Sequence, residues 1–127
     1  MSPWILVFLG GGLGAAARHG VNVAGTRLLG FGFPWATLTV NVVGSLLMGL
    51  IAGWLAFKAG IGWSQHLRLF LTTGFLGGFT TFSAFSLDTA LLWERGEAGL
   101  AAGYILANVV LAIAGLFAGL WFVRSLA

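Results

Sequence analysis

Four long stretches of this sequence contain no charged side chain. They are residues 1–17, 28–57, 69–87 and 98–123. The whole chain of 127 residues has only six Lys and Arg and three Asp and Glu, while 59% of its residues are hydrophobic. A soluble domain needs about a quarter of its residues charged to keep its surface hydrated. The chain must therefore meet lipid over most of its surface.

Each uncharged stretch is long enough for one membrane crossing. A hydrocarbon core of about 30 Å requires roughly 17 to 25 helical residues, and at these lengths only a helix satisfies its own backbone polar groups in lipid. The sequence predicts an all-α membrane protein with a single domain over residues 1–127. We expect its four transmembrane helices near residues 3–28, 34–58, 66–94 and 98–125.

The basic residues are divided almost evenly between the two ends of such a bundle. Four crossings put both termini on one side, which carries Lys58, Arg68 and Arg124, while the other side carries Arg27 and Arg95. This asymmetry is weak by the positive-inside rule, in which Lys and Arg orient a membrane protein. Two alternatives remain open. The chain inserts in both orientations, which permits an antiparallel, dual-topology homodimer, or it inserts in one orientation that other details set.

Other classes of protein are excluded by what the sequence lacks. It has no cysteine, which rules out disulfides, thiolate metal sites and cysteine nucleophiles. Its basic residues are scattered singly and form no patch for nucleic acid. No Ser–His–Asp set or carboxylate pair is visible, so the sequence predicts that the protein is not an enzyme.

Glycine is frequent, with 21 residues, and often lies four residues from another small residue. In lipid this spacing lets helix backbones approach closely. We interpret all such pairs as helix-packing sites. The pairs are Gly10/Gly14, Gly11/Ala15, Gly49/Gly53, Gly99/Gly103 and Gly115/Gly119.

Three polar side chains in the first, second and fourth spans each have two interpretations. Asn41 and Asn108 either clasp neighbouring helices, because a buried amide must be hydrogen-bonded, or donate N–H to a passing solute. Arg18 either extends to the lipid headgroups or forms a positive vestibule that concentrates anions.

The third span contains GFLGGFTTFSAFS at residues 74–86, which weakens a continuous helix. Gly77 and Gly78 each destabilise a helix by about 1 kcal/mol relative to Ala, and the β-branched Thr80 and Thr81 add to this effect. We predict a helix break near Gly77–Thr80. In an antiparallel dimer two breaks would meet near the bilayer midplane, where freed carbonyls suit a hard cation such as Na+.

Beyond the break, Phe82, Phe85 and Ser86 share one helix face. In one interpretation they are core aromatics beside hydroxyls that bond back to their own helix. In the other, electropositive ring edges together with hydroxyl and amide donors hold a small anion weakly enough to release it.

Taken together, these motifs resemble the Fluc fluoride channels, also called CrcB proteins. The matching segments are GGGLGAAARH, PWATLTVNVVGS and TTGFLGGFTTFSAFS, followed by Tyr104, in the same order along the whole chain. The resemblance implies a passive, fluoride-selective channel that exports toxic fluoride across the bacterial inner (plasma) membrane. It also implies an antiparallel homodimer with two fluoride pathways and a structural Na+ at its centre.

The resemblance assigns roles to particular residues. Backbone carbonyls of Gly77 and Thr80 would hold the Na+, and Arg18 matches the basic residue of the family's first helix, at the vestibule. The predicted fluoride pathway comprises Asn41, Phe82, Phe85, Ser83, Ser86, Thr39, Tyr104 and Asn108.

The chain departs from the family pattern at several positions. Some relatives carry a hydroxyl residue where this chain has Asn108, and Ala112 and Leu116 further along offer no hydroxyl. We therefore expect a polar track along the fourth helix that is shorter, or that is routed through the hydroxyl residues of the other helices. Asp88 stands where relatives often have the longer Glu.

Two other functions remain as alternatives. A small dual-topology multidrug exporter would need a carboxylate in its first span to exchange protons for substrate, and this chain has none there. A non-transporting scaffold would explain the glycine spacing but not GFTTFSAFS. The expected partners are fluoride, membrane lipid and a second copy of the chain, with no nucleic acid.

Overall fold

The computed structural model describes residues 2–57 and 61–126, and they are almost entirely helical. The elements are α1 (Pro3–Leu29), α2 (Trp35–Phe57), α3 (Ile61–Arg68), the π-helix η1 (Leu69–Leu76), α4 (Gly77–Phe79), α5 (Phe82–Glu94) and α6 (Ala98–Leu126). Within the described residues, four helical segments are long and apolar enough to cross a membrane, the third of them over Gln65–Glu94. The predicted all-α architecture with four spans is confirmed.

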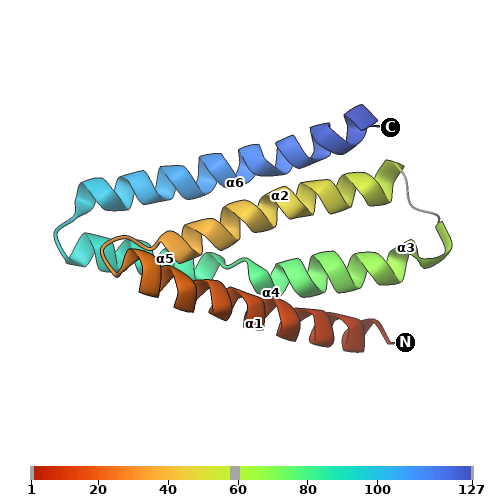
Figure 1. Cartoon of the computed structure of the whole chain (residues 1–127), viewed down its shortest axis with the longest axis horizontal. Coiled ribbons are helices and arrows are strands. Elements are labelled where there is room, and N and C mark those ends of the chain that lie inside the picture. The colour runs from red at the N-terminus through yellow and green to blue at the C-terminus, as the bar shows by residue number, and fades with distance from the viewer. Residues whose placement is uncertain (1, 58–60, 127) are drawn as a thin grey trace.

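The four spans lie side by side, and both termini are at the same end (Figure 1). The connection from α1 to α2 and the turn from α5 to α6 are at the opposite end (Figure 1). The principal neighbours are α2 with α6, and α1 with η1 and α4. The third span is thus held between α1 on one side and α2 and α6 on the other.

The ends of the helices follow from local sequence. Ser2 caps α1 by accepting a hydrogen bond from the Trp4 backbone N–H at 3.2 Å, and Pro3 occupies the first turn, where its missing N–H costs nothing. Gly30, with φ of 77°, ends α1 in the left-handed region that favours glycine. These bounds agree with the predicted first helix.

The other predicted bounds agree less evenly. The fourth helix agrees to within one residue, and α2 begins one residue after the predicted 34, while its predicted end at residue 58 lies outside the described residues. The third span was predicted from residue 66, whereas helical structure already begins at Ile61.

Glycines allow α1 to lie directly on the backbone of the third span. A Cβ on Gly10 would lie 2.5 Å from the carbonyl oxygen of Phe70, and a Cβ on Gly14 would collide with that of Phe75. Such distances are impossible for any other residue, so the predicted packing role of these glycines is confirmed.

A second interface with close glycine contacts, here called a seam like the one between α1 and the third span, joins α2 to α6. A Cβ on Gly49 would collide with the Leu116 carbonyl oxygen, and one on Gly119 would lie 2.6 Å from that of Leu46. Gly99 and Gly103 differ, because a Cβ on either would meet nothing within 4 Å. Within the described chain this pair packs against no other helix, because both residues lie on the exposed face of α6, and its packing role stays a prediction.

The break in the third span is present but lies later than the glycine pair. Thr80 and Thr81 are extended, with φ/ψ of −87°/161° and −153°/122°. Gly77 is helical, with φ/ψ of −61°/−37°, and a Cβ on Gly78 would collide with the Gly11 carbonyl oxygen. The predicted break near Gly77–Thr80 is confirmed at the C-terminal end of that range: Thr80 and Thr81 leave the helix, while Gly78 stays helical in close contact with α1.

The π-helix η1 before the break was not anticipated. Its hydrogen bonds span one residue more than those of an α-helix, which widens each turn. The Gly77 N–H at its end reaches the carbonyls of both Gly74 and Thr72. The sequence of η1, LFLTTGFL, is plain for a membrane helix and contains no signal for this geometry.

Candidate functional site

Asn41 of α2 binds the broken backbone of the third span. Its Oδ1 accepts a hydrogen bond from the Thr81 N–H at 2.8 Å, and its Nδ2 donates to the Thr81 carbonyl at 3.1 Å. The same Nδ2 also donates to Oδ1 of Asn108 at 2.9 Å. The Asn41 oxygen therefore replaces the helical acceptor that the Thr81 N–H has lost, and its Nδ2 adds a second bond to the Thr81 carbonyl. The clasp interpretation of Asn41 is confirmed.

Two backbone groups determine the orientation of both amides in this cluster. The Thr81 N–H can only donate, so it must face the oxygen of Asn41. The Tyr104 carbonyl can only accept, and it receives Nδ2 of Asn108 at 3.1 Å, which leaves the Asn108 oxygen toward Asn41. Both hydrogens of the Asn41 amide are consequently engaged within the protein.

The break deprives two backbone carbonyls of their helical donors. In a continuous helix the Gly77 carbonyl would accept from the Thr81 N–H, and the Thr80 carbonyl from the Ala84 N–H. Here the Thr81 N–H goes to Asn41, and the Ala84 N–H goes to the Thr81 hydroxyl at 3.1 Å, an N-cap for α5. The two carbonyls assigned to Na+ by the resemblance are therefore among those whose helical donors the break redirects.

Arg18 points to the middle of the span rather than to its end. Its Nε donates to the Gly78 carbonyl at 3.0 Å, and the residue is half-buried. A cation at the C-terminal end of a helix is favourable because it complements the helix dipole. The alternative that Arg18 extends to the headgroups is wrong for this structure.

A central groove of about 420 Å³ opens beside the break. It is bordered by α2, α4, α5 and α6 and is open on one side. Its lining residues are Asn41, Gly44, Ser45, Met48, Leu76, Thr80, Thr81, Phe82, Phe85, Asn108, Val109, Ala112, Ile113 and Leu116. No described residue in this lining is charged, so the groove offers only dipoles and aromatic edges to an ion.

Two phenylalanines of the groove differ sharply in exposure. Phe82 is 77% exposed, whereas Phe85 is 8% exposed. Their ring centroids are 5.4 Å apart with an interplanar angle of 63°, so the edge of one ring is turned toward the other. They are neighbours at i and i+3, as predicted.

The hydroxyl groups near the break bond partly to backbone and partly to other side chains. The Ser86 hydroxyl donates to the Phe82 carbonyl at 3.0 Å, and the Thr80 hydroxyl donates to the Leu76 carbonyl at 2.9 Å, as the plainer interpretation of these residues expected. The hydroxyl oxygen of Ser83 lies 3.3 Å from that of Thr81. Thr39 is exposed and lies outside the lining of the groove, where Ser45 of α2 is present instead.

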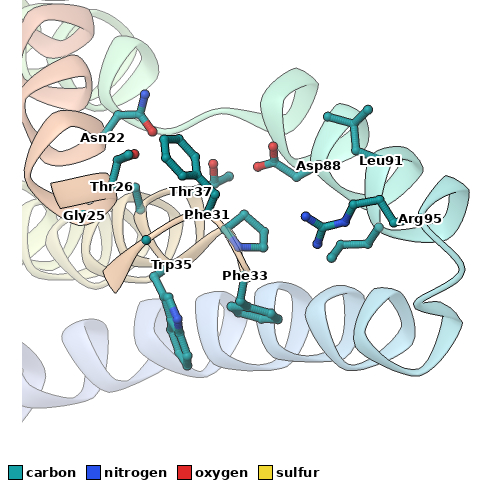
Figure 2. Close-up of a pocket in the computed structure, with 14 residues that line it drawn as sticks. Asn22, Gly25, Thr26, Phe31, Phe33, Trp35, Thr37, Asp88, Leu91 and Arg95 are labelled. Atoms are coloured by element: carbon teal, nitrogen blue, oxygen red, sulfur yellow. The ribbon is translucent and has the colours of Figure 1, made fainter. Parts of the chain in front are cut away.

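A polar cleft leads from the loop end of the bundle to the break. It consists of two adjoining cavities, of about 310 Å³ and about 200 Å³, which share Asn22, Ala36, Thr37 and Asp88. In Figure 2, Asp88 of α5 turns its carboxylate toward Thr37 of α2, and Arg95 turns its guanidinium into the cavity. Arg18 lines the inner cavity. The two hollows meet at Thr81, which lines both this cleft and the central groove.

Tyr104 connects the cleft to the groove without lining either. It is fully buried, and its hydroxyl donates to Oδ2 of Asp88 at 2.9 Å. Its ring centroid is 5.4 Å from that of Phe85 and 5.4 Å from that of Phe33. Tyr104 therefore ties α6 to α5 through both its ring and its hydroxyl.

Some residues of the cleft were missed by the sequence analysis. Asn22 and Thr26 follow Arg18 at successive four-residue steps on one face of α1, a pattern that could have been recognised. The hydrogen bond between Tyr104 and Asp88 joins residues sixteen positions apart on different helices, and no sequence pattern predicts it.

Comparison with known proteins assigns the chain to a family. The sequence profile described as "CrcB-like protein, Camphor Resistance (CrcB)" matches residues 5–120. The chain belongs to the CrcB family. Among its CrcB relatives, the Fluoride-specific ion channel FluC of Rhodopseudomonas palustris (strain BisB5) is 64% identical over 123 residues, which are 97% of this chain and 98% of that protein.

More distant relatives have the same kind of name. The Fluoride-specific ion channel FluC 2 of Nitrobacter hamburgensis is 61% identical over 97% of this chain and 98% of its own. The FluC of Beijerinckia indica subsp. indica is 55% identical over 99% of both chains. The family and these names identify a channel, not an enzyme, and the four apolar spans make this CrcB protein a multi-pass membrane protein.

Proposed function

We propose that this CrcB protein is a fluoride-selective channel that exports toxic fluoride passively across the bacterial inner (plasma) membrane. The observation that carries the proposal is the uncharged central groove at the helix break, where two phenylalanine edges and two amides converge. Conduction requires binding that is favourable but weak, and dipoles without fixed charge meet this requirement. The names of the CrcB relatives support fluoride as the ion.

The groove is half of a pathway, and an antiparallel second copy would complete it. Phe82 is 77% exposed although it lies near the middle of the span, and the groove is open on that side. A partner related by a two-fold axis in the membrane plane would cover both grooves at once. This arrangement would give two pathways per dimer, as the resemblance implies.

In this pathway, fluoride would enter through the polar cleft and reach the groove past Thr81. Arg18 would raise the local anion concentration in the cleft. The hydrated ion would then exchange water for the edges of Phe82 and Phe85 and for amide and hydroxyl hydrogens. The Asn41 hydrogen bonded to Asn108 is the one most readily given to the ion, because its loss leaves the Thr81 backbone paired. Ser83, Ser86, Tyr104, Thr39 and Asn108 are the further members proposed for this route.

The residues at the break fit a structural Na+ ion at the dimer centre. The Gly77 and Thr80 carbonyls have lost their helical donors, Gly77 is exposed on the protomer, and carbonyl oxygen is a suitable ligand for a hard cation. When bound, the ion would supply positive charge that holds the two breaks together. Gly77 and Thr80 would hold it from each copy.

Purified protein in liposomes loaded with KF and KCl tests this function. We expect rapid fluoride efflux, recorded with a fluoride electrode, without chloride efflux, because only the smaller anion gains enough from close donors to offset its lost hydration. A folded, dimeric sample that releases no fluoride would refute the channel. Release that requires a proton gradient would favour the multidrug exporter instead. Any ion flux would exclude the non-transporting scaffold.

Dual topology is tested by labelling from one side of the membrane. The chain has no cysteine, and a Cβ on Gly99 meets nothing within 4 Å, so Gly99→Cys introduces one reporter without strain. In cells, an impermeant maleimide should label about half of the copies, since both orientations insert when the Lys and Arg bias is weak. Complete labelling, or none before lysis, would show one orientation and exclude the antiparallel dimer.

A further inference from the structure

The three hydrogen bonds of Asn41 are not equivalent. Two of them join its amide to the backbone of Thr81 and keep the break paired. The third joins Nδ2 to Oδ1 of Asn108, a side chain that is only 4% exposed but borders the groove. This third bond can open without unpairing any backbone group.

Asn108 is held so that its oxygen must face Asn41. Its Nδ2 donates to the Tyr104 carbonyl one turn earlier on α6, and a carbonyl cannot exchange roles with a donor. The Asn108 oxygen therefore satisfies a buried amide hydrogen that would otherwise lack a partner. The same hydrogen lies at the edge of the groove through which an anion is proposed to pass.

We propose that Asn108 is a positioning residue for Asn41: its oxygen is the resting acceptor of the Asn41 hydrogen, and a passing anion displaces it. The proposal rests on the proposed function as a fluoride channel. It assigns to Asn108 a role different from lining the pore with a donor. Asn108 sets how tightly Asn41 binds the ion.

Two consequences follow from displacement. The displaced Asn108 oxygen is a negative dipole end next to the anion, so it weakens anion binding and speeds release. The displacement energy is the same for every anion, so it cancels from the difference between fluoride and chloride and leaves the selectivity to the other donors of the groove. Asn108 thereby raises the turnover of the pathway without changing its selectivity.

The substitution Asn108→Leu tests this, since it removes the acceptor with little change in shape. Initial fluoride efflux from liposomes is measured against fluoride concentration. We expect the half-saturating concentration and the maximal rate each to fall about tenfold, because the Asn41 hydrogen then has no partner except the ion. A merely structural defect would lower the rate without tightening the half-saturating concentration.

Two further variants separate the acceptor from its surroundings. Asn108→Thr should restore part of both values, because its hydroxyl can donate to the Tyr104 carbonyl and still present oxygen to Asn41. Val110→Leu is the matched control on the exposed face of α6, where Val110 is 56% exposed, and it should match the wild type. Identical behaviour of Asn108→Leu and Asn108→Thr would overturn the proposal.

A direct readout uses the side-chain amide protons of Asn41 in an NMR titration with NaF, with NaCl in parallel. Displacement predicts that fluoride shifts the proton bonded to Asn108, while the proton bonded to Thr81 stays in place. Fluoride flux without any shift of the Asn41 amide would overturn this inference and leave the channel intact. Absence of flux from folded wild-type protein would overturn the proposed function first.

Discussion

Gly14→Ala is expected to abolish the folded protein. The new Cβ would collide with the Phe75 carbonyl oxygen and would lie 2.9 Å from the Phe79 backbone nitrogen. These atoms belong to the backbone of the third span, so no side-chain rotation relieves the contact, and α1 must move away. Overpacking of a rigid site costs about 3 kcal/mol or more. The yield of monodisperse protein in detergent, and its thermal unfolding midpoint, measure the loss.

The matched control is Gly12→Ala, two residues earlier on the same helix. A Cβ on Gly12 meets nothing within 4 Å, and the position is exposed. Replacing a helical glycine by alanine should stabilise the helix by up to about 1 kcal/mol. Equal yields of the Gly12→Ala and Gly14→Ala proteins would show that the seam between α1 and the third span is looser than described.

Asn41→Asp should reduce fluoride efflux about a hundredfold, since it removes two amide hydrogen bonds that are each worth about tenfold. A carboxylate can still accept from the Thr81 N–H. Its second oxygen, however, would face the Thr81 carbonyl and Oδ1 of Asn108, which are both acceptors. The negative charge would also repel fluoride in the groove. Efflux is recorded from liposomes that contain equal amounts of dimeric protein.

A second pathway variant and a control variant are compared with Asn41→Asp. Phe82→Ile removes one ring edge and leaves the Asn41 bonds in place, so its expected loss is smaller, about tenfold. Val43→Ile changes an exposed apolar residue of the same helix as Asn41 and should conduct normally. Normal conduction by both Asn41→Asp and Phe82→Ile would contradict the proposed pathway.

The number and placement of the spans could be predicted because they depend on composition alone. A long stretch without charged residues is stable in lipid rather than in water, and each of the four stretches has the length of one crossing. The first and fourth helices agree with the structure to within one residue at each end. The family could be predicted as well, because separated motifs recur in a constant order.

The break was predicted near Gly77–Thr80, but which of these residues leave the helix could not be predicted, because two weak local signals compete over adjacent residues. The glycine pair has the lower helix propensity, yet Gly78 stays helical against α1 while Thr81 is extended. The difference is decided by Asn41, forty residues away, which pairs with the Thr81 backbone only when that residue is extended. A contact between residues forty positions apart cannot be recognised from the sequence around either residue.

The sequence by itself determined that this chain is a four-span membrane protein, which residues are polar inside lipid, and which family it belongs to. Only the tertiary structure decided what those polar residues do. Arg18 binds the Gly78 carbonyl, and Asn108 accepts from Asn41. The physical reason is that a buried polar group in lipid must find a partner, and which partner it finds depends on the helices that packing brings within hydrogen-bond distance.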